Sequence, residues 1–256
     1  MKISRIQLSA LSQWPHWRLG PSEEKLTHAP ILSCQLKGGL TNTSYLLLTP
    51  ERKLKLRINS LNTRLLGIDR SLEAKIVTEL APSGICPQLL YSDPHQRYSI
   101  FEYVEGRVWG AVDFNSKQQC QRLLGLVDVF QGVKFEHTSF SYANHLNTYQ
   151  GATCVGENLT HEESEQLNNF IVRFRAFESS SWVPVLSHHD LVAENIVEHE
   201  GGLSILDWEY AALGHPDFDR KCIAAKSALE KLCPNSNDII YELMHWMNRL
   251  WEAVNK

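Results

Sequence analysis

The chain has 256 residues, 43% of them hydrophobic, and its 25 Lys and Arg against 29 Asp and Glu give a formal net charge of −4. This length and apolar content support one large domain or two lobes. The acidic balance excludes nucleic acid as the main partner, because phosphate backbones are bound by clustered Lys and Arg. It leaves room for a cationic substrate.

Six cysteines are present without a Cys-x-x-Cys pair, in a chain too long to need disulfides for its stability. The first residues lack the apolar core of a signal segment, and no stretch approaches the roughly 20 apolar residues that cross a bilayer. We therefore expect reduced thiols in a cytoplasmic protein that does not act at a membrane.

The N-terminal part predicts a leader followed by a strand, a loop and a second strand. Residues 1–30 contain two tryptophans and three prolines, and we expect them to pack on the first lobe with a short helix near 21–24. The apolar runs at 31–36 and 45–48 predict strands. Between them, the Gly-Gly pair in the loop at 37–44 lets backbone amides approach phosphate oxygens closely, although an ordinary hairpin turn has the same composition.

A third strand and a helix follow. Residues 53–58 alternate basic and apolar side chains, which predicts a half-buried strand with a basic face. The apolar stripe within residues 70–81 predicts a helix that ends at Pro82 and Gly84. Glu73 lies on this helix.

Two more strands and two helices are predicted before the most polar motif of the chain. The strands are expected at 87–91 and 98–104, around a turn at Asp-Pro-His. The first helix is expected at 117–130. The second begins at a capping box, Thr160-His-Glu-Glu163, and runs to about Phe177.

Residues 185–218 combine polar residues with a predicted hairpin. Ile196-Val197 and Leu203–Leu206 flank a Gly-Gly turn, so they pair naturally as two strands. The outer ends of a hairpin meet, which places Asn195 near Asp207, with Asp190 on the loop that enters the first strand. Oxygen ligands of this kind suit Mg²⁺.

These residues resemble the catalytic segment of the aminoglycoside phosphotransferase/choline kinase family, on His188-x-Asp190-x-x-x-x-Asn195 and Ile205-Leu-Asp207-Trp-Glu-Tyr210. The resemblance implies an α+β, two-lobed protein-kinase-like fold. The expected N-lobe, residues 1–104, has an antiparallel sheet and one main helix, and the expected C-lobe, residues 105–256, is mostly helical. It implies three catalytic residues, Asp190 as base or hydroxyl-orienting residue and Asn195 and Asp207 as the ligands of Mg²⁺ on ATP.

The resemblance extends to residues that would bind the nucleotide. Gly-Gly-Leu-Thr-Asn is similar to the phosphate loop of choline kinase-like proteins, Arg57 matches a strand cation that pairs with Glu73, and 101–106 resembles the hinge that holds adenine. The implied ATP-binding residues are Gly38, Gly39, Thr41, Asn42, Arg57, Glu73, Phe101, Glu102 and Tyr103. The loop departs from the Gly-x-Gly-x-x-Gly of protein kinases and is not a Walker A loop.

The acceptor is less defined. Asp-Trp-Glu-Tyr resembles choline and thiamine kinases, both with cationic alcohols as substrates, and does not separate the two. The predicted C-terminal helix at 238–254 is strongly aromatic, which indicates core packing for most of these side chains or a cation–π wall for a quaternary nitrogen. The implied substrate-binding residues are Trp208, Glu209, Tyr210 and Trp246.

Three alternatives remain open. One is an aminoglycoside or other small-metabolite phosphotransferase of the same fold. The second is a metal-dependent phosphohydrolase that uses His189 and Asp190, although such proteins place this pair on a helix. The third is a nucleotide-binding protein without activity.

The resemblance makes His188 structural and leaves His189 at a variable position, and we expect both to orient the loop through hydrogen bonds rather than to bind metal.

Overall fold

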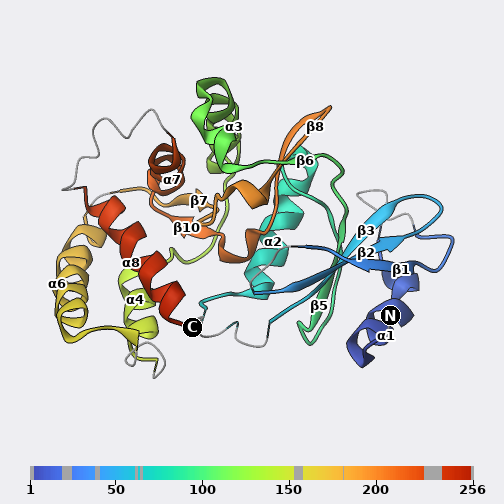
Figure 1. Cartoon of the computed structure of the whole chain (residues 1–256), viewed down its shortest axis with the longest axis horizontal. Coiled ribbons are helices and arrows are strands. Elements are labelled where there is room, and N and C mark those ends of the chain that lie inside the picture. Colours follow the sequence, from blue (N-terminus) through green and yellow to red (C-terminus); the bar gives the residue numbers. More distant parts are fainter. Residues whose placement is uncertain are drawn as a thin grey trace. The chain divides into compact units, whose positions relative to one another are not determined.

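A computed structural model describes residues 3–18, 25–37, 41–60, 63, 66–152, 158–180, 182–227 and 238–254 (Figure 1). The chain forms two compact units, each built from separate stretches of sequence. The first comprises Met1–Asn62, Arg70–Trp109 and Glu194–Trp208, and the second comprises Thr63–Asp69, Gly110–Ala193 and Glu209–Lys256. The predicted boundary between two functional lobes after Val104 stays a prediction. The hairpin that follows Asn195 belongs to the first compact unit.

The first unit contains a five-stranded antiparallel sheet in the order β1-β2-β3-β5-β4. Its strands are β1 Ile31–Gln35, β2 Thr43–Leu48, β3 Lys53–Ile58, β4 Leu89–Ser92 and β5 Tyr98–Glu102. All five confirm the predicted strands within a few residues at each end. Leu54 and Leu56 are fully buried as the alternation predicts, whereas Arg57 departs from it and is buried as well.

One main helix and a short N-terminal helix accompany this sheet. Helix α2, Arg70–Leu80, confirms the predicted helix and continues into a 3-10 turn, η2, Ala81–Ser83. Helix α1, Arg5–Ser12, is followed by η1, Trp14–His16, and was not predicted. The helix predicted near 21–24 lies outside the described residues. Ala10, Trp17 and Leu26 belong to the core of the sheet, so the leader packs on this unit as expected.

The predicted hairpin forms a second small sheet in the first unit. Strands β8, Ile196–His199, and β9, Gly202–Ile205, pair antiparallel, and β6, Arg107–Val108, joins them at the edge of β8. A short 3-10 turn precedes the hairpin, η4 Ala193–Asn195, and another follows it, η5 Trp208–Tyr210.

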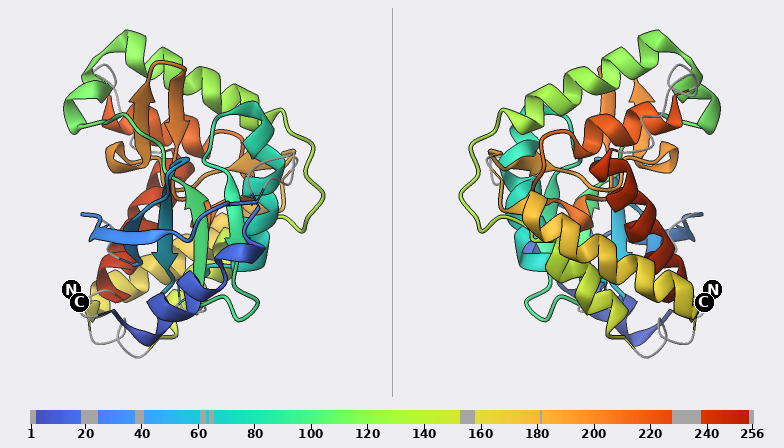
Figure 2. Two further views of the ribbon diagram at one scale, coloured as in Figure 1. Left: turned by 90° about the vertical axis from the view of Figure 1, so that its right-hand side faces the viewer. Right: turned by 90° about the vertical axis from the view of Figure 1, so that its left-hand side faces the viewer.

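The second unit is mostly helical. Its helices are α3 Lys117–Gln131, α4 Tyr142–Gln150, α6 His161–Glu178, α7 Phe218–Lys226 and α8 Ile239–Val254, with a 3-10 turn η3 Ala111–Asn115 and a two-stranded sheet of β7 Val185–Ser187 and β10 Ala212–Gly214. Helices α4, α6 and α8 lie against one another (Figure 2, right). The capping box at Thr160 is formed as predicted. No helix among the described residues is long and apolar enough to span a membrane.

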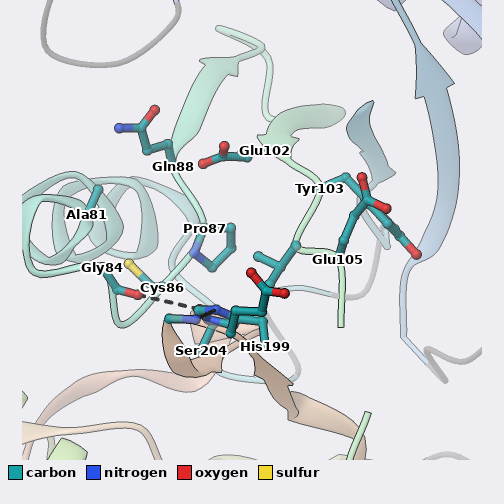
Figure 3. A pocket seen from close by; sticks show the side chains of 13 residues that line it. Ala81, Gly84, Cys86, Pro87, Gln88, Glu102, Tyr103, Glu105, His199 and Ser204 are labelled. Carbon is teal, nitrogen blue, oxygen red and sulfur yellow. Dashed lines mark hydrogen bonds between the residues drawn. The ribbon is translucent and has the colours of Figure 1, made fainter. Parts of the chain in front are cut away.

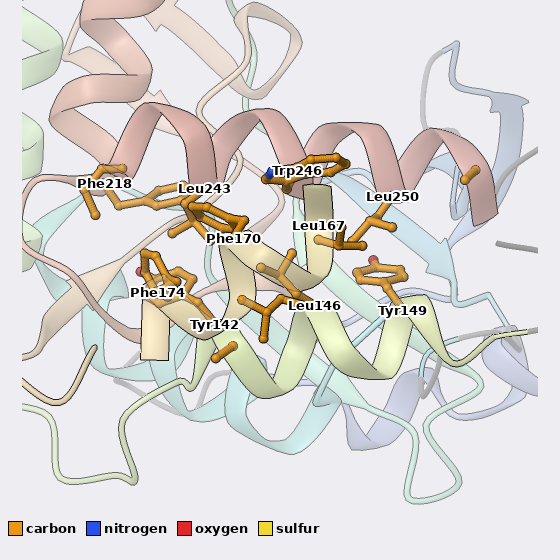
Figure 4. Close-up of a cluster of buried hydrophobic side chains, with 14 of the residues drawn as sticks. Tyr142, Leu146, Tyr149, Leu167, Phe170, Phe174, Phe218, Leu243, Trp246 and Leu250 are labelled. Atoms are coloured by element: carbon orange, nitrogen blue, oxygen red, sulfur yellow. The ribbon is translucent and has the colours of Figure 1, made fainter. Parts of the chain in front are cut away.

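The core of the second unit explains why its amphipathic helices assemble. Aromatic and aliphatic side chains of α4, α6 and α8 interdigitate there (Figure 4). Tyr142, Leu146, Phe170, Leu243 and Leu250 are all fully or almost fully buried. Burying such a side chain contributes roughly 1.5–3 kcal/mol, which makes this cluster the main stabilising feature of the unit.

Candidate active site

The strand cation and the helix carboxylate form a buried bidentate ion pair. Arg57 donates from Nη1 to Oε1 of Glu73 at 2.6 Å and from Nη2 to Oε2 at 2.7 Å. The two side chains are only 3% and 4% exposed. The predicted pairing of β3 with α2 is therefore confirmed, in the fork geometry that a guanidinium makes best with a carboxylate.

A second arginine extends this pair to the loop before β2. Arg70 donates to Oε2 of Glu73 at 2.9 Å and to Oδ1 of Asn42 at 2.9 Å. The amide N–H of Ser60 donates to the same oxygen of Asn42 at 3.1 Å. Sequence reasoning missed Arg70, although its position three residues before Glu73 on the helix is the spacing at which side chains meet.

These contacts give Asn42 a structural role. Its amide oxygen holds the end of the loop before β2 to α2 and to the segment after β3, and its predicted contact with nucleotide stays a prediction. Thr41 precedes it on the same loop, and Gly38 and Gly39 lie outside the described residues.

Charge is balanced inside this cluster. Burial by itself would raise the pKa of Glu73, but the guanidinium groups of Arg57 and Arg70 outweigh it and hold the pKa below its usual range. The Nε of Arg57 also donates to Oδ1 of Asn59 at 3.0 Å, and the guanidinium lies 4.9 Å from the centre of the Phe101 ring. Glu73 is therefore ionised at neutral pH, and Arg57 is held in one orientation.

Asp207 connects this cluster to the hairpin. Its Oδ1 accepts a hydrogen bond from Nη1 of Arg57 at 3.2 Å, and its side chain is 25% exposed. Its backbone has a φ of +61°, in the left-handed region that residues with a Cβ rarely adopt. Such conformations persist where the surroundings enforce them, often at functional sites.

The hairpin brings Asn195 and Asp207 to its open end, as predicted. The amide of Leu206 donates to the carbonyl oxygen of Asn195 at 2.7 Å, beyond the last ladder pair of Ile196 with Ile205. Asp190 lies in the second unit, and its predicted approach to the other two residues remains a prediction.

Asn195 and Asp207 suit a magnesium ion whose other ligands are phosphate oxygens and water. Asn195 and Asp207 offer an amide oxygen and a carboxylate, and Mg²⁺ in phosphoryl-transfer sites takes one or two such ligands together with phosphates and water. Within the described part of the chain, no group of three or more His, Cys, Asp or Glu side chains could hold a metal ion. That Asn195 and Asp207 bind a metal stays a prediction.

In the second unit, the segment that carries Asp190 is anchored by a buried carboxylate. Asp219 accepts the backbone N–H of His188 at 2.7 Å and that of His189 at 3.0 Å. The amide of Asp190 donates to Nδ1 of His188 at 3.2 Å. Asp219 was not among the predicted site residues; the only signal was its place in the Gly-His-Pro-Asp-Phe-Asp stretch after Tyr210.

Both histidines orient this segment, as predicted. His188 is completely buried, and the ring of His189 bonds to Tyr142 and to the carbonyl of Tyr210. The ring of His189 is thus bonded at both nitrogens, and its assignment to a variable position of the family stays a prediction. These bonds, and the position of the pair on a loop rather than a helix, also remove the reason to read His189 as a phosphohydrolase metal ligand.

The hinge residues border a cavity. The amides of Glu102 and Tyr103 donate to the carbonyls of Gln88 and Lys53 at 2.9 and 3.2 Å, which holds the segment after β5 in place. A cavity of about 640 Å³ opens between this segment, the turn after α2 and the β8–β9 turn (Figure 3). Arg57, Glu73, Asn195 and Asp207 do not line it, so this cavity is not the charged cluster described above.

The predicted acceptor residues differ in exposure. Trp208 and Trp246 are 1% and 4% exposed, and Nε1 of Trp208 donates to the carbonyl of Ile205 at 2.9 Å. These two tryptophans have a clear packing role, and their contact with a substrate stays a prediction. Glu209 is buried too, whereas Tyr210 is partly exposed and accepts a hydrogen bond from Nε1 of Trp251 at 3.2 Å.

An antiparallel sheet with a buried Arg–Glu pair, together with a helical unit, defines an α+β, protein-kinase-like fold. Solved structures with this fold include choline kinase LicA from Streptococcus pneumoniae, with a TM-score of 0.73, 19% identity, and coverage of 88% of this chain and 86% of that one. Another is a thermostable mutant of the aminoglycoside phosphotransferase APH(4)-Ia in a ternary complex with AMP-PNP and hygromycin B, with a TM-score of 0.59, 15% identity, and coverage of 86% and 83%.

The chain belongs to the APH phosphotransferase enzyme family, whose model matches residues 34–225. The family resemblance of the sequence is thereby confirmed. A curated relative is Protein LicA of Haemophilus influenzae, which is 24% identical over 199 residues, or 76% of this chain. The chain spans 58% of the length of that relative.

Proposed function

We propose that this protein is an ATP-dependent kinase that transfers the γ-phosphoryl group to the hydroxyl of a small cationic alcohol, of the choline or thiamine type. The observation that carries the proposal is the buried Arg57–Glu73 pair with Asp207 against it, at the end of the hairpin that follows Asn195. Phosphoryl transfer depends on positioning and charge neutralisation rather than on covalent chemistry by the protein. Membership of a phosphotransferase family supports the same reaction class.

In this proposal each residue has one role. Asp190 accepts the proton of the acceptor hydroxyl while its oxygen forms a bond to the γ-phosphorus. The bond from the γ-phosphorus to the bridging oxygen breaks, and ADP leaves with that electron pair. Arg57, held in orientation by Glu73, contacts the phosphates. Asn195 and Asp207 hold Mg²⁺, which neutralises phosphate charge when it is bound.

The acceptor class rests on charge and aromatic surface. Tyr210 and Trp251 are hydrogen bonded and partly exposed, and the carboxylate next to Tyr210 in the chain is that of the buried Glu209. Aromatic faces with a nearby carboxylate attract a quaternary nitrogen. The likeness to a choline kinase favours a choline-type acceptor, and thiamine remains the alternative.

The test is an ADP-release assay with Mg-ATP against choline, ethanolamine, thiamine and hygromycin B, run beside calorimetric ATP binding. We expect acceptor-dependent ADP release with a cationic alcohol. Asp190→Ala should abolish this release and leave ATP binding intact. ADP release with hygromycin B and with none of the other three acceptors would support the aminoglycoside alternative. ATP binding without ADP release on any acceptor would support a non-catalytic nucleotide-binding protein.

A further inference from the structure

The residue between His188 and Asp190 has a backbone that a side chain disfavours. His189 has a φ of +66°, in the left-handed region where Cβ crowds the following carbonyl. A glycine would adopt this conformation at no cost. A histidine here must therefore be held by its surroundings.

Both ring nitrogens of His189 are hydrogen bonded. Nε2 lies 2.8 Å from the hydroxyl of Tyr142, and Nδ1 lies 3.0 Å from the carbonyl oxygen of Tyr210. The same hydroxyl of Tyr142 accepts the amide N–H of His215 at 2.9 Å. The ring thus links the loop to the start of α4 and to the segments on both sides of β10.

The chemistry of these partners determines where the protons lie. The carbonyl of Tyr210 can only accept, so Nδ1 of His189 carries the hydrogen. In a neutral ring Nε2 then has no hydrogen and can only accept, so the hydroxyl of Tyr142 donates its proton to Nε2 while it accepts the amide of His215. The ring is therefore the neutral Nδ1–H tautomer. A second proton on the ring would meet the proton of the phenol, in keeping with the burial that lowers the pKa of His189 to about 3.

Aromatic rings and a glycine pack around the ring of His189. The rings of Phe140 and Phe218 lie 5.5 and 4.8 Å from that of His189. Gly214, on β10, passes directly beside the hydrogen bond. A Cβ at this position would lie 2.3 Å from the hydroxyl of Tyr142 and 2.5 Å from Nε2 of His189. The bond exists only because residue 214 has no side chain.

We propose that His189 is a positioning residue for Asp190, and that Tyr142 and Gly214 act with it as one lock on the catalytic loop. The ring holds the left-handed turn that sets the direction of the next residue, while Asp219 holds the two amides that precede the turn, those of His188 and His189. Misplacing a reacting group by about 1 Å can cost on the order of 100-fold in rate. This inference rests on the proposed function.

Two variants of His189 distinguish the effect of losing the imidazole ring from the effect of the left-handed backbone. His189→Gly removes the ring and relieves the strained φ. His189→Asn keeps a side chain that tolerates the left-handed region but is too short to reach Tyr142. If the ring positions Asp190, both variants lower kcat by about 10- to 100-fold, with the KM for ATP within about twofold of wild type. Wild-type kcat in His189→Gly would overturn the proposal.

The hydroxyl of Tyr142 gives a second, milder variant. Tyr142→Phe keeps the packed ring and should lower kcat by about 2- to 10-fold, the range of one hydrogen bond. The double variant with His189→Gly should be no slower than His189→Gly alone, because both remove the same interaction. Multiplied losses would contradict a single lock. Gly214→Ala should reproduce the loss with both partner residues unchanged, because its Cβ would force them apart.

Tyr149→Phe is the matched control, since this buried tyrosine of the same helix donates its hydroxyl to the carbonyl of Leu66 at 3.4 Å and does not contact His189 in the described structure. It should keep wild-type kcat.

A spectroscopic readout does not depend on turnover. In ¹⁵N-histidine spectra, the resonances of His189 are identified as those that His189→Gly lacks. In the wild type they should show a protonated Nδ1 and an unprotonated Nε2 from pH 5 to 8. The Nε2 resonance should shift in Tyr142→Phe. The opposite tautomer would refute the lock even if the kinase is active. The predicted tautomer without kinase activity would instead refute the proposed function and leave the lock standing.

Discussion

The carboxylate of Asp207 lies 3.2 Å from the guanidinium of Arg57, a residue 150 positions earlier in the chain. The same nitrogen, Nη1, also donates to one oxygen of Glu73, and Nη2 donates to the other. One cation is thus shared between a buried carboxylate and a partly exposed one. Two arginines and two carboxylates meet in this cluster, and the partly exposed carboxylate is the one predicted to bind metal.

Replacing Arg57 should damage both stability and activity. Arg57→Ala leaves Glu73 buried with only Arg70 as a cationic partner, and removing one side of a buried ion pair costs about 3–5 kcal/mol. We expect a loss of this size in urea unfolding, with nucleotide binding much weakened. Lys53→Ala is the control on the same strand. Its exposed pair with Glu105 is worth about 1 kcal/mol or less. Similar losses in the two variants would contradict the buried pair.

The left-handed backbone of Asp207 makes a separate prediction. Asp207→Gly and Asp207→Ala both remove the carboxylate and should both abolish phosphoryl transfer. At a φ of +61°, however, alanine costs roughly 1–2 kcal/mol more than glycine. Thermal unfolding should therefore rank Asp207→Gly above Asp207→Ala. Equal stability of the two would argue against this backbone conformation.

Asn42 should matter for the loop rather than for the core of the sheet. Asn42→Ala removes the acceptor shared by Arg70 and the amide of Ser60, and the loss of these hydrogen bonds costs about 1–3 kcal/mol. We expect that loss together with a raised KM for ATP and an unchanged KM for the acceptor. Asn144→Ala, at an exposed position on α4, should change neither stability nor KM. A raised KM for the acceptor alone would contradict this role of Asn42.

The pH dependence of stability should report on Asp219. Burial raises its pKa to about 6 despite the N–H groups of His188 and His189, which act in the opposite direction. Below its ordinary pKa this carboxyl is protonated in both states; between that value and about 6 only the folded state holds the proton. Stability from this group is therefore greatest in acid and is lost as the pH rises towards 6.

The measurement is the difference in unfolding free energy between wild type and Asp219→Asn from pH 3 to 8. This difference should fall by about 3 kcal/mol at most as the pH rises from the ordinary carboxyl pKa through about 6, because each unit of pKa shift corresponds to about 1.4 kcal/mol. A difference that grows with pH would show that the folded pKa is lowered instead.

Much of the secondary structure could be predicted because its causes are local. The stripe of α2, the capping box at Thr160 and the Gly-Gly turn between β8 and β9 each lie within a few residues of the structure they specify. A hairpin joins its own ends, so the meeting of Asn195 with Asp207 followed from spacing alone. The family resemblance depended on the same short segment.

The tertiary structure decided the partners that neither a local pattern nor the resemblance indicated. The alternation of β3 predicted a basic face, and the resemblance predicted the pairing of Arg57 with Glu73. Only the structure shows that this pair is buried and is joined by Arg70 and Asp207. Tyr142 lies 47 positions before His189, and Gly214 lies on another strand. Periodicity records which face of an element is apolar, but it carries no information about which distant side chain packs on that face. The sequence by itself therefore determined the elements and the motif, and packing between distant segments determined the ion-pair cluster and the hold on His189.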